Sequence, residues 1–132
     1  MALEQGELTG RIIGAAIQVH KALGPGFLES IYGKAFAVEL RTAGIPFERE
    51  RDVPILYRGE QVGIHRLDFF VGGEIIVELK AVSGLEDVHF TVVKSYLSAV
   101  GKRHGLILNF SKPALEIRRV ITETSSFLGG AS

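Results

Sequence analysis

Apolar residues recur every three or four positions in three stretches of the chain, residues 8–23, 27–43 and 86–102. This spacing places them along one side of an α-helix, so the pattern predicts three amphipathic helices. A glycine directly follows each of the first two stretches and is a typical helix stop signal. Ser83 and Glu86 have the spacing of a capping box, which predicts the start of the third helix.

Helical-wheel positions predict which side of each helix is buried. The first helix has an apolar stripe of Leu8, Ile12, Ala15, Ala16, Val19 and Leu23. In the second helix the residues expected to face the core are Leu28, Ile31, Ala35 and Val38, and those expected to face solvent are Ser30, Lys34, Ala37 and Arg41. The expected inward residues of the third helix are Val88, Val92, Val93, Tyr96, Leu97 and Val100. Gly10 and Gly14 weaken the first helix, so we expect another element to approach it closely there.

The segments between and after these helices have the composition of β-strands. They are residues 46–57, the two apolar strands on either side of Gly72-Gly73, residues 105–110 and residues 114–121. The first strand alternates charge from Glu48 to Asp52, which we interpret as a solvated face. The order helix, helix, three strands, helix, two strands predicts a mixed β-sheet flanked by α-helices, an α/β (α+β) fold.

Length and composition limit the classes of protein further. The chain has 132 residues, enough for one domain over 1–132, and we expect residues 1–6 and 123–132 to be frayed. Lys and Arg number 15 against 15 Asp and Glu, so the overall charge gives no support for a nucleic-acid or membrane partner. The sequence has no cysteine, which excludes disulfides and thiolate metal sites and fits a cytoplasmic protein. Its longest apolar runs fall far short of the roughly 20 residues of a membrane-spanning helix.

Three charged residues stand in the two strands around Gly72-Gly73, where side chains are expected to be buried. They are Asp68, Glu78 and Lys80. Isolated charges in a protein interior cost several kcal/mol, so these groups are expected to serve one another or a bound cation. Two carboxylates on neighbouring strands suit Mg²⁺, with Mn²⁺ as a substitute, and an adjacent lysine suits hydrolysis of a phosphodiester. The structural alternative is a buried ion pair of a carboxylate with Lys80 or Arg66.

The shared-metal hypothesis depends on the register of these two strands. A two-residue hairpin loop would place Asp68 opposite Val77 and therefore on the other face of the sheet from Glu78. We predict instead a three-residue loop, for example Val71-Gly72-Gly73 with a glycine in the left-handed region, or a bulge near Asp68.

Two further polar residues lie on the predicted helices. Glu29 shares a flank of the second helix with Tyr32, and we expect both to line a cleft with Asp68 and Glu78. The alternative for Glu29 is interaction with the helix dipole. His20 lies at the edge of the first helix's apolar side, where a hydrogen-bonded structural role is favoured over a catalytic one.

The stretch Gly26-Phe-Leu-Glu29-Ser-Ile-Tyr32 resembles the motif of the GxxExxY proteins, a branch of the PD-(D/E)xK nuclease-like superfamily. The order of the other motifs is similar too, namely the helix ending at His20, Arg66-Leu-Asp68, Ile76-Val-Glu78-Leu-Lys80 and Ser95-Tyr96-Leu97. The resemblance implies a restriction-endonuclease-like three-layer core.

The same resemblance implies a role for each matching residue. Asp68 and Glu78 correspond to metal ligands, Lys80 to the catalytic lysine and Glu29 to an acidic residue beside the metal. Tyr32, Tyr96, His20 and Arg66 are implied as supporting residues. The sequence has Val92 where the family usually has a glutamine, and valine cannot hydrogen-bond a phosphate or a water.

These observations favour a Mg²⁺-dependent nuclease acting on DNA or RNA. One alternative is a catalytically weakened domain of the same fold that binds nucleic acid or protein. Another is a metal-dependent phosphoesterase with a different substrate. The sequence leaves assembly into a homo-oligomer open.

Overall fold

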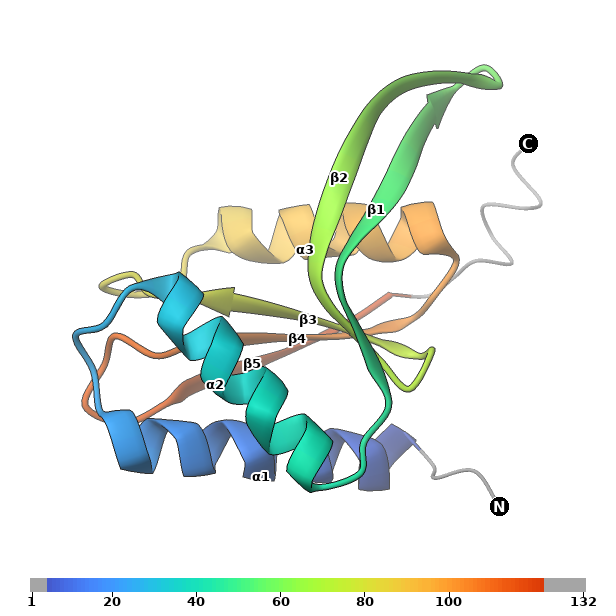
Figure 1. Cartoon of the computed structure of the whole chain (residues 1–132). Helices are drawn as coiled ribbons and strands as arrows, with labels where there is room; N and C mark the ends of the chain where they lie inside the picture. The colour runs from blue at the N-terminus through green and yellow to red at the C-terminus, as the bar shows by residue number, and fades with distance from the viewer. Residues whose placement is uncertain (1–4, 123–132) are drawn as a thin grey trace.

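A five-stranded mixed sheet in the order β1-β2-β3-β4-β5 forms the centre of the computed structural model, which describes residues 5–122 (Figure 1). The helices are α1 (Gln5–Leu23), α2 (Glu29–Thr42) and α3 (Asp87–Val100). The strands are β1 (Phe47–Tyr57), β2 (Glu60–Val71), β3 (Ile75–Lys80), β4 (His104–Asn109) and β5 (Glu116–Ile121). Strands β3 and β4 are parallel and the other neighbours are antiparallel. The predicted element order and the mixed sheet are therefore confirmed.

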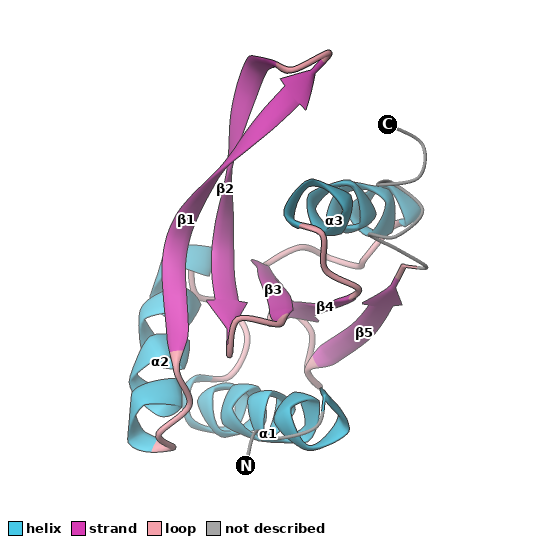
Figure 2. Ribbon diagram, turned by 90° about the vertical axis from the view of Figure 1, so that its right-hand side faces the viewer, coloured by secondary structure: helices cyan, strands magenta, loops and turns pink. Residues whose placement is uncertain are grey.

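The helices cover opposite faces of the sheet, α1 and α2 on one and α3 on the other (Figures 1 and 2). Successive β4 residues contribute to the two sides: Leu106 and Leu108 pack with α1 and α2, and Ile107 packs with α3. A strand buried on both faces explains the continuous apolar run in this part of the sequence. In the part of the chain that the structure describes, no helix has the length and apolarity needed to cross a membrane.

The buried face of α2 differs from the prediction. Its buried residues are Tyr32, Gly33, Phe36, Ala37 and Leu40. The predicted core residues Leu28, Ile31 and Val38 are exposed instead, at 72%, 40% and 52%. The stripe of Tyr32, Phe36 and Leu40 removes more apolar area from water than Ile31, Ala35 and Val38 would, so the helix is rotated toward the larger side chains.

The predictions for the other two helices need smaller corrections. The stripe on α1 is buried as expected apart from the partly buried Leu23, but no atom of another element within residues 5–122 lies within 4 Å of a Cβ added at Gly10 or Gly14. Residues 5 and 6 belong to α1 and are not frayed, whereas residues 1–4 and 123–132 lie outside the described residues. In α3 the N-cap is Glu86 itself, and His89, rather than Ser83, completes its capping box. Val93 and Leu97 are buried, whereas Val88 and Val92 are exposed.

The loop between β2 and β3 has three residues, as the register argument requires. Val71 pairs with Ile75, so the loop is Gly72–Glu74, one position later than the example given for it. Gly72 and Gly73 have φ of 63° and 67°, a left-handed conformation that favours glycine. A Cβ at Gly72 would stand 2.8 Å from a methyl carbon of Leu8. This loop therefore packs closely against Leu8 of α1, whereas the close approach expected at Gly10 and Gly14 is not found.

Candidate active site

The strand β2 changes the direction of its side chains at Asp68. Before this residue Leu67 packs with the α3 cluster, and after it Phe70 does so too, although strict alternation would put them on opposite faces. Phe69 packs on the α1–α2 side. The position facing Asp68 in β1 is Glu50, a non-glycine residue with φ of 52°. Beyond this irregularity the β1–β2 hairpin projects away from the rest of the sheet (Figure 1).

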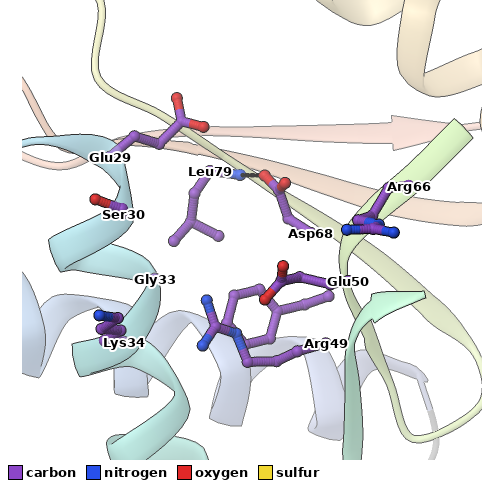
Figure 3. A pocket seen from close by; sticks show the side chains of 10 residues that line it. Glu29, Ser30, Gly33, Lys34, Arg49, Glu50, Arg66, Asp68 and Leu79 are labelled. Atoms are coloured by element: carbon purple, nitrogen blue, oxygen red, sulfur yellow. Dashed lines mark hydrogen bonds between the residues drawn. The ribbon is translucent and has the colours of Figure 1, made fainter. Parts of the chain in front are cut away.

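Asp68 and Glu78 lie where the pairing of β2 with β3 ends, directly beyond the Phe69–Val77 pair. The backbone N–H of Asp68 donates to Glu78 Oε2 at 2.9 Å. The backbone N–H of Leu79 donates to Asp68 Oδ2 at 2.8 Å, a bond visible in Figure 3. Each carboxylate thus holds the strand opposite to its own. The two acidic side chains share one location, as the three-residue loop predicts.

Two adjoining cavities open at this location. The cavity toward α3 has a volume of about 270 Å³ and contains Glu78 and Lys80 in its lining. The cavity toward α2 has a volume of about 380 Å³ and is drawn in Figure 3. Glu29, Arg66 and Asp68 line both cavities. The sequence motifs on α2, β2 and β3 therefore meet at one site.

Burial and mutual repulsion shape the electrostatics of this site. Burial, reinforced by the Asp68 carboxylate, raises the pKa of Glu78 to about 8. Burial also raises the pKa of Asp68 and, with help from the Asp68 charge, that of Glu29. The Lys80 ammonium acts in the opposite direction on the pKa of all three carboxyls but does not outweigh burial. Such perturbed carboxyls in a cleft are typical of catalytic sites.

The buried ion pair considered from the sequence is not formed. Within residues 5–122, no salt bridge includes Asp68, Glu78 or Lys80. Arg66 donates from Nε to Asp52 Oδ1 at 2.9 Å, and both side chains are more than half exposed. The acidic pair is therefore without a direct cationic partner among the described residues.

Carboxylate oxygens that accept no hydrogen bond are the atoms with which Asp68 and Glu78 could bind a cation. Asp68 Oδ1 and Glu78 Oε1 accept no hydrogen bond from the residues that the structure describes. These residues include no group of three His, Asp or Glu side chains arranged to bind a metal ion. Two carboxylates with the remaining positions filled by water are an ordinary environment for Mg²⁺. The donor set fits a hard divalent ion held by Asp68 and Glu78.

Two of the supporting residues implied by the resemblance lie elsewhere. Tyr32 has no exposed surface, stacks on Phe110 with ring centroids 4.6 Å apart, and hydrogen-bonds the Gly24 carbonyl. A fully buried ring cannot line a cleft, so that expectation is wrong. His20 Nε2 lies 2.9 Å from the Lys112 carbonyl oxygen, in agreement with the structural role favoured for it. Tyr32 instead ties the Gly24–Phe27 loop to the start of α2.

Two stacked rings line the cavity toward α3, and the sequence singled out only one of them. Tyr96 stacks on His65 with centroids 3.4 Å apart and an interplanar angle of 14°. Burial lowers the pKa of His65, whose Nε2 is buried without a hydrogen-bond partner in the described region. Val92 also lines this cavity and is 36% exposed. His65 could have been found from sequence as a polar residue two positions before Leu67, on the same face of β2.

Arg49 was expected on a solvated strand face, but it lines the cavity toward α2. Its guanidinium lies over the Phe69 ring, 5.1 Å from the centroid, and Nε is buried without a hydrogen-bond partner among the described residues. A Cβ on Gly33 would stand 3.0 Å from Arg49 Nη2, so this glycine makes room for the guanidinium. The exposed Glu48, Arg51 and Asp52 agree with the original interpretation.

Comparison with known families agrees with this arrangement. A model of the PD-(D/E)XK nuclease superfamily matches residues 6–120, which is most of the chain, and the protein belongs to this superfamily. The mixed sheet between two helical layers is the restriction-endonuclease-like fold that such membership predicts. Membership indicates hydrolysis of phosphodiester bonds by a nuclease-type site. No curated protein and no solved structure matches the chain significantly.

Proposed function

We propose that this protein is a nuclease that uses a divalent cation, Mg²⁺ or its substitute Mn²⁺, to hydrolyse phosphodiester bonds in nucleic acid. The observation that carries the proposal is the Asp68–Glu78 pair, in which Glu78 is buried and Asp68 is half-buried at the junction of two cavities, and which forms no ion pair among the described residues. The spacing of Gly26, Glu29 and Tyr32 further supports assignment to the GxxExxY branch of the superfamily.

The acidic pair is suited to a cation because no cationic side chain within residues 5–122 forms an ion pair with it. Ionising both carboxyls places two negative charges in a partly desolvated site, which is why the pKa of Glu78 lies near 8. A cation between them would remove this repulsion and favour the ionised forms. When bound, such an ion polarises the phosphate and lowers the pKa of a bound water.

Lys80 and Glu29 have complementary tasks in this proposal. Lys80 projects from β3 two residues beyond Glu78, on the same side of the strand, and its ammonium can stabilise negative charge that develops on the phosphate. Glu29, at the first turn of α2, lines both cavities of the site, and the Ala81 backbone opposes the rise in its pKa. Its raised pKa suits it to accept a proton from a water or to return one to a leaving oxygen.

The rim of the cavity toward α2 can hold the substrate's backbone. Lys34, Arg49 and Arg66 lie around this cavity (Figure 3). Guanidinium groups bind phosphates in a bidentate manner, and the guanidinium-bearing side chains of Arg49 and Arg66 line this cavity. The even overall charge of the chain does not by itself oppose nucleic-acid binding, because three cationic side chains line this cavity together with three carboxylates.

A catalytically weakened binding domain is the second candidate. The observation favouring it is Val92, whose methyl groups line the cavity beside Glu78 and Lys80 where the family usually places a glutamine. A missing amide would remove one hydrogen bond to a phosphate or water. Binding without turnover would result if that bond is indispensable.

The test is a cleavage assay on single-stranded and double-stranded DNA and RNA with Mg²⁺, Mn²⁺ or EDTA. Wild type should cut at least one substrate only with a divalent ion. Lys80→Ala should lower turnover by about 100-fold or more, because one preorganised donor at a developing charge contributes on that scale. Lys94→Ala is the matched control, since Lys94 is exposed and lies on α3 about 200° around the helix from Val92.

Loss of cleavage in Lys80→Ala with unchanged metal affinity supports the assigned roles, because lysine is not a metal ligand. Cleavage that continues at the wild-type rate would remove Lys80 from the mechanism. Nucleic-acid binding by a wild type that cuts none of the substrates would favour the binding domain over the nuclease.

A further inference from the structure

A third cavity lies between the β1–β2 hairpin and α3 and adjoins the catalytic one. Its volume is about 530 Å³, within the range of small-molecule sites. The hairpin contributes Ile55 and Leu56 to it, and α3 contributes Ser98 and Ala99. Its lining contains no carboxylate, lysine or arginine. This groove is thus apolar with hydroxyl groups on the α3 side, in contrast to the charged site beside it.

The stacked rings of His65 and Tyr96 join the two cavities. Both residues line the apolar groove, and both also line the cavity that holds Asp68, Glu78 and Lys80. The charges of Asp68 and Lys80 act on the pKa of His65, and those of Glu78 and Asp68 on that of Tyr96, so the rings lie within electrostatic reach of the catalytic groups. An occupant of the groove would therefore sit next to a phosphate at the acidic pair.

We propose that the groove binds a nucleobase adjacent to the scissile phosphate, so that the protein acts on single-stranded or otherwise unpaired nucleic acid. This inference rests on the proposed nuclease function. A nucleobase is planar, uncharged and directly linked to a phosphodiester, which matches an apolar groove with an aromatic wall beside a phosphate site. Stacking on aromatic side chains is the usual way in which proteins bind unpaired bases.

Base pairing decides the substrate class. In a duplex both faces of each base are covered by stacking, and only base edges are accessible from the grooves. A base can enter a site between a hairpin and a helix only after it has left the stack. The hydroxyl of Ser98 can bond to a base edge without selecting one base strictly, because hydroxyls both donate and accept.

The experiment uses one labelled single-stranded oligonucleotide, the same strand in a duplex, and strands with one abasic residue at successive positions around the cleavage site. Affinity is measured by fluorescence anisotropy with Ca²⁺, and cleavage with Mg²⁺. We expect removal of the base that occupies the groove to weaken affinity by about 5- to 150-fold, the range for stacking of one base. Full pairing should weaken affinity similarly.

The variant Ala99→Trp fills the groove from an exposed position of α3, where the fold should tolerate a larger side chain. Ala99→Trp should bind the intact single strand as weakly as wild type binds the abasic strand. The affinity of Ala99→Trp for the abasic strand should be no lower than either of these two affinities. Gln18→Trp is the matched control, because Gln18 is exposed on α1, on the other side of the sheet. This control should leave all affinities unchanged.

Equal affinity of Ala99→Trp and wild type for the intact strand would overturn the base groove, as would tighter binding of the duplex. An Ala99→Trp defect that adds fully to the abasic defect would also overturn it. The anisotropy comparison does not require turnover. Absence of cleavage by wild type would thus contradict the proposed function, while the affinities decide the groove separately.

Discussion

The Asp68–Glu78 pair can be compared with a second polar pair of the same sheet, formed by Asn109 at the end of β4 and Glu116 at the start of β5. Asn109 is fully buried, and both its amide atoms are used. Its Oδ1 accepts from the Val82 N–H at 3.0 Å, and its Nδ2 donates to the Val82 carbonyl and to Glu116 Oε1 at 2.9 and 3.0 Å. Through these bonds, Asn109 and Glu116 attach the segment that follows β3, at Val82, to the end of β4 and the start of β5.

The two pairs have opposite electrostatics. The hydrogen bond from Asn109 lowers the pKa of Glu116, and Arg118 lies 3.6 Å from its second oxygen. The pKa of Glu78, in contrast, is raised by burial and by a second carboxylate. A carboxylate with satisfied bonds and a lowered pKa stabilises the fold. A pair of carboxyls whose pKa values are raised by burial, and for Glu78 also by the Asp68 charge, costs stability, and such a cost is expected where a site is built for a ligand.

The largest expected difference between the Asp68–Glu78 pair and the Asn109–Glu116 pair is in turnover. Asp68→Asn keeps the hydrogen bond from the Leu79 N–H but removes a charge, so we expect turnover to fall by about 1,000-fold or more, equivalent to several kcal/mol. Glu116→Gln makes the same chemical change in the other pair and should leave turnover within about twofold of wild type, because Glu116 lines neither cavity of the site and glutamine can still accept the Asn109 hydrogen bond. Cleavage rates with saturating Mg²⁺ measure both. A comparable loss in the two variants would mean that neither pair is specifically catalytic.

A smaller effect should appear in the pH dependence of stability. The pKa of Glu78 is about 8 in the fold, against an ordinary value of 4.5 for a glutamate in the unfolded chain. A raised pKa gives stability that is complete below 4.5 and is lost as the pH rises through 8. Between pH 6 and 9 the metal-free protein should therefore lose about 2 kcal/mol of unfolding free energy through this group.

Urea unfolding in EDTA at pH 6, 7.5 and 9 measures this loss. Glu78→Gln should abolish most of it and should be more stable than wild type at pH 9. Glu116 should not contribute to the loss of stability between pH 6 and 9. Its pKa is lowered, so the stability it provides is lost only toward acid pH, below the range tested. Equal slopes in wild type and Glu78→Gln would contradict the repulsion assigned to the acidic pair.

The sequence was most informative where one constraint dominated. The hydrophobic periodicity located all three helices and the continuous apolar strand β4, since each has to bury a face. The strand register followed from the requirement that Asp68 and Glu78 share a face, and the three-residue loop Gly72–Glu74 meets it.

The sequence was least informative where tertiary contacts decide. Competing apolar stripes on α2 differ only by a rotation, and packing against the sheet selected Tyr32, Phe36 and Leu40. The inward position of Arg49 depends on space left by Gly33, a contact between distant parts of the chain. The change of side-chain direction at Asp68 likewise arises from the bend of the β1–β2 hairpin, for which strict alternation gives no signal.

The most direct test of the central claim is isothermal titration calorimetry of the protein with Mn²⁺ at pH 7.5. The account predicts at least one binding site that includes Asp68 and Glu78, with release of a proton, because binding requires the ionised form of a carboxyl whose pKa is about 8. Buffers with different ionisation enthalpies measure that proton. This site should vanish in Asp68→Asn and remain in Glu116→Gln. Failure of wild type to bind Mn²⁺, or unaltered binding by Asp68→Asn, would contradict the account.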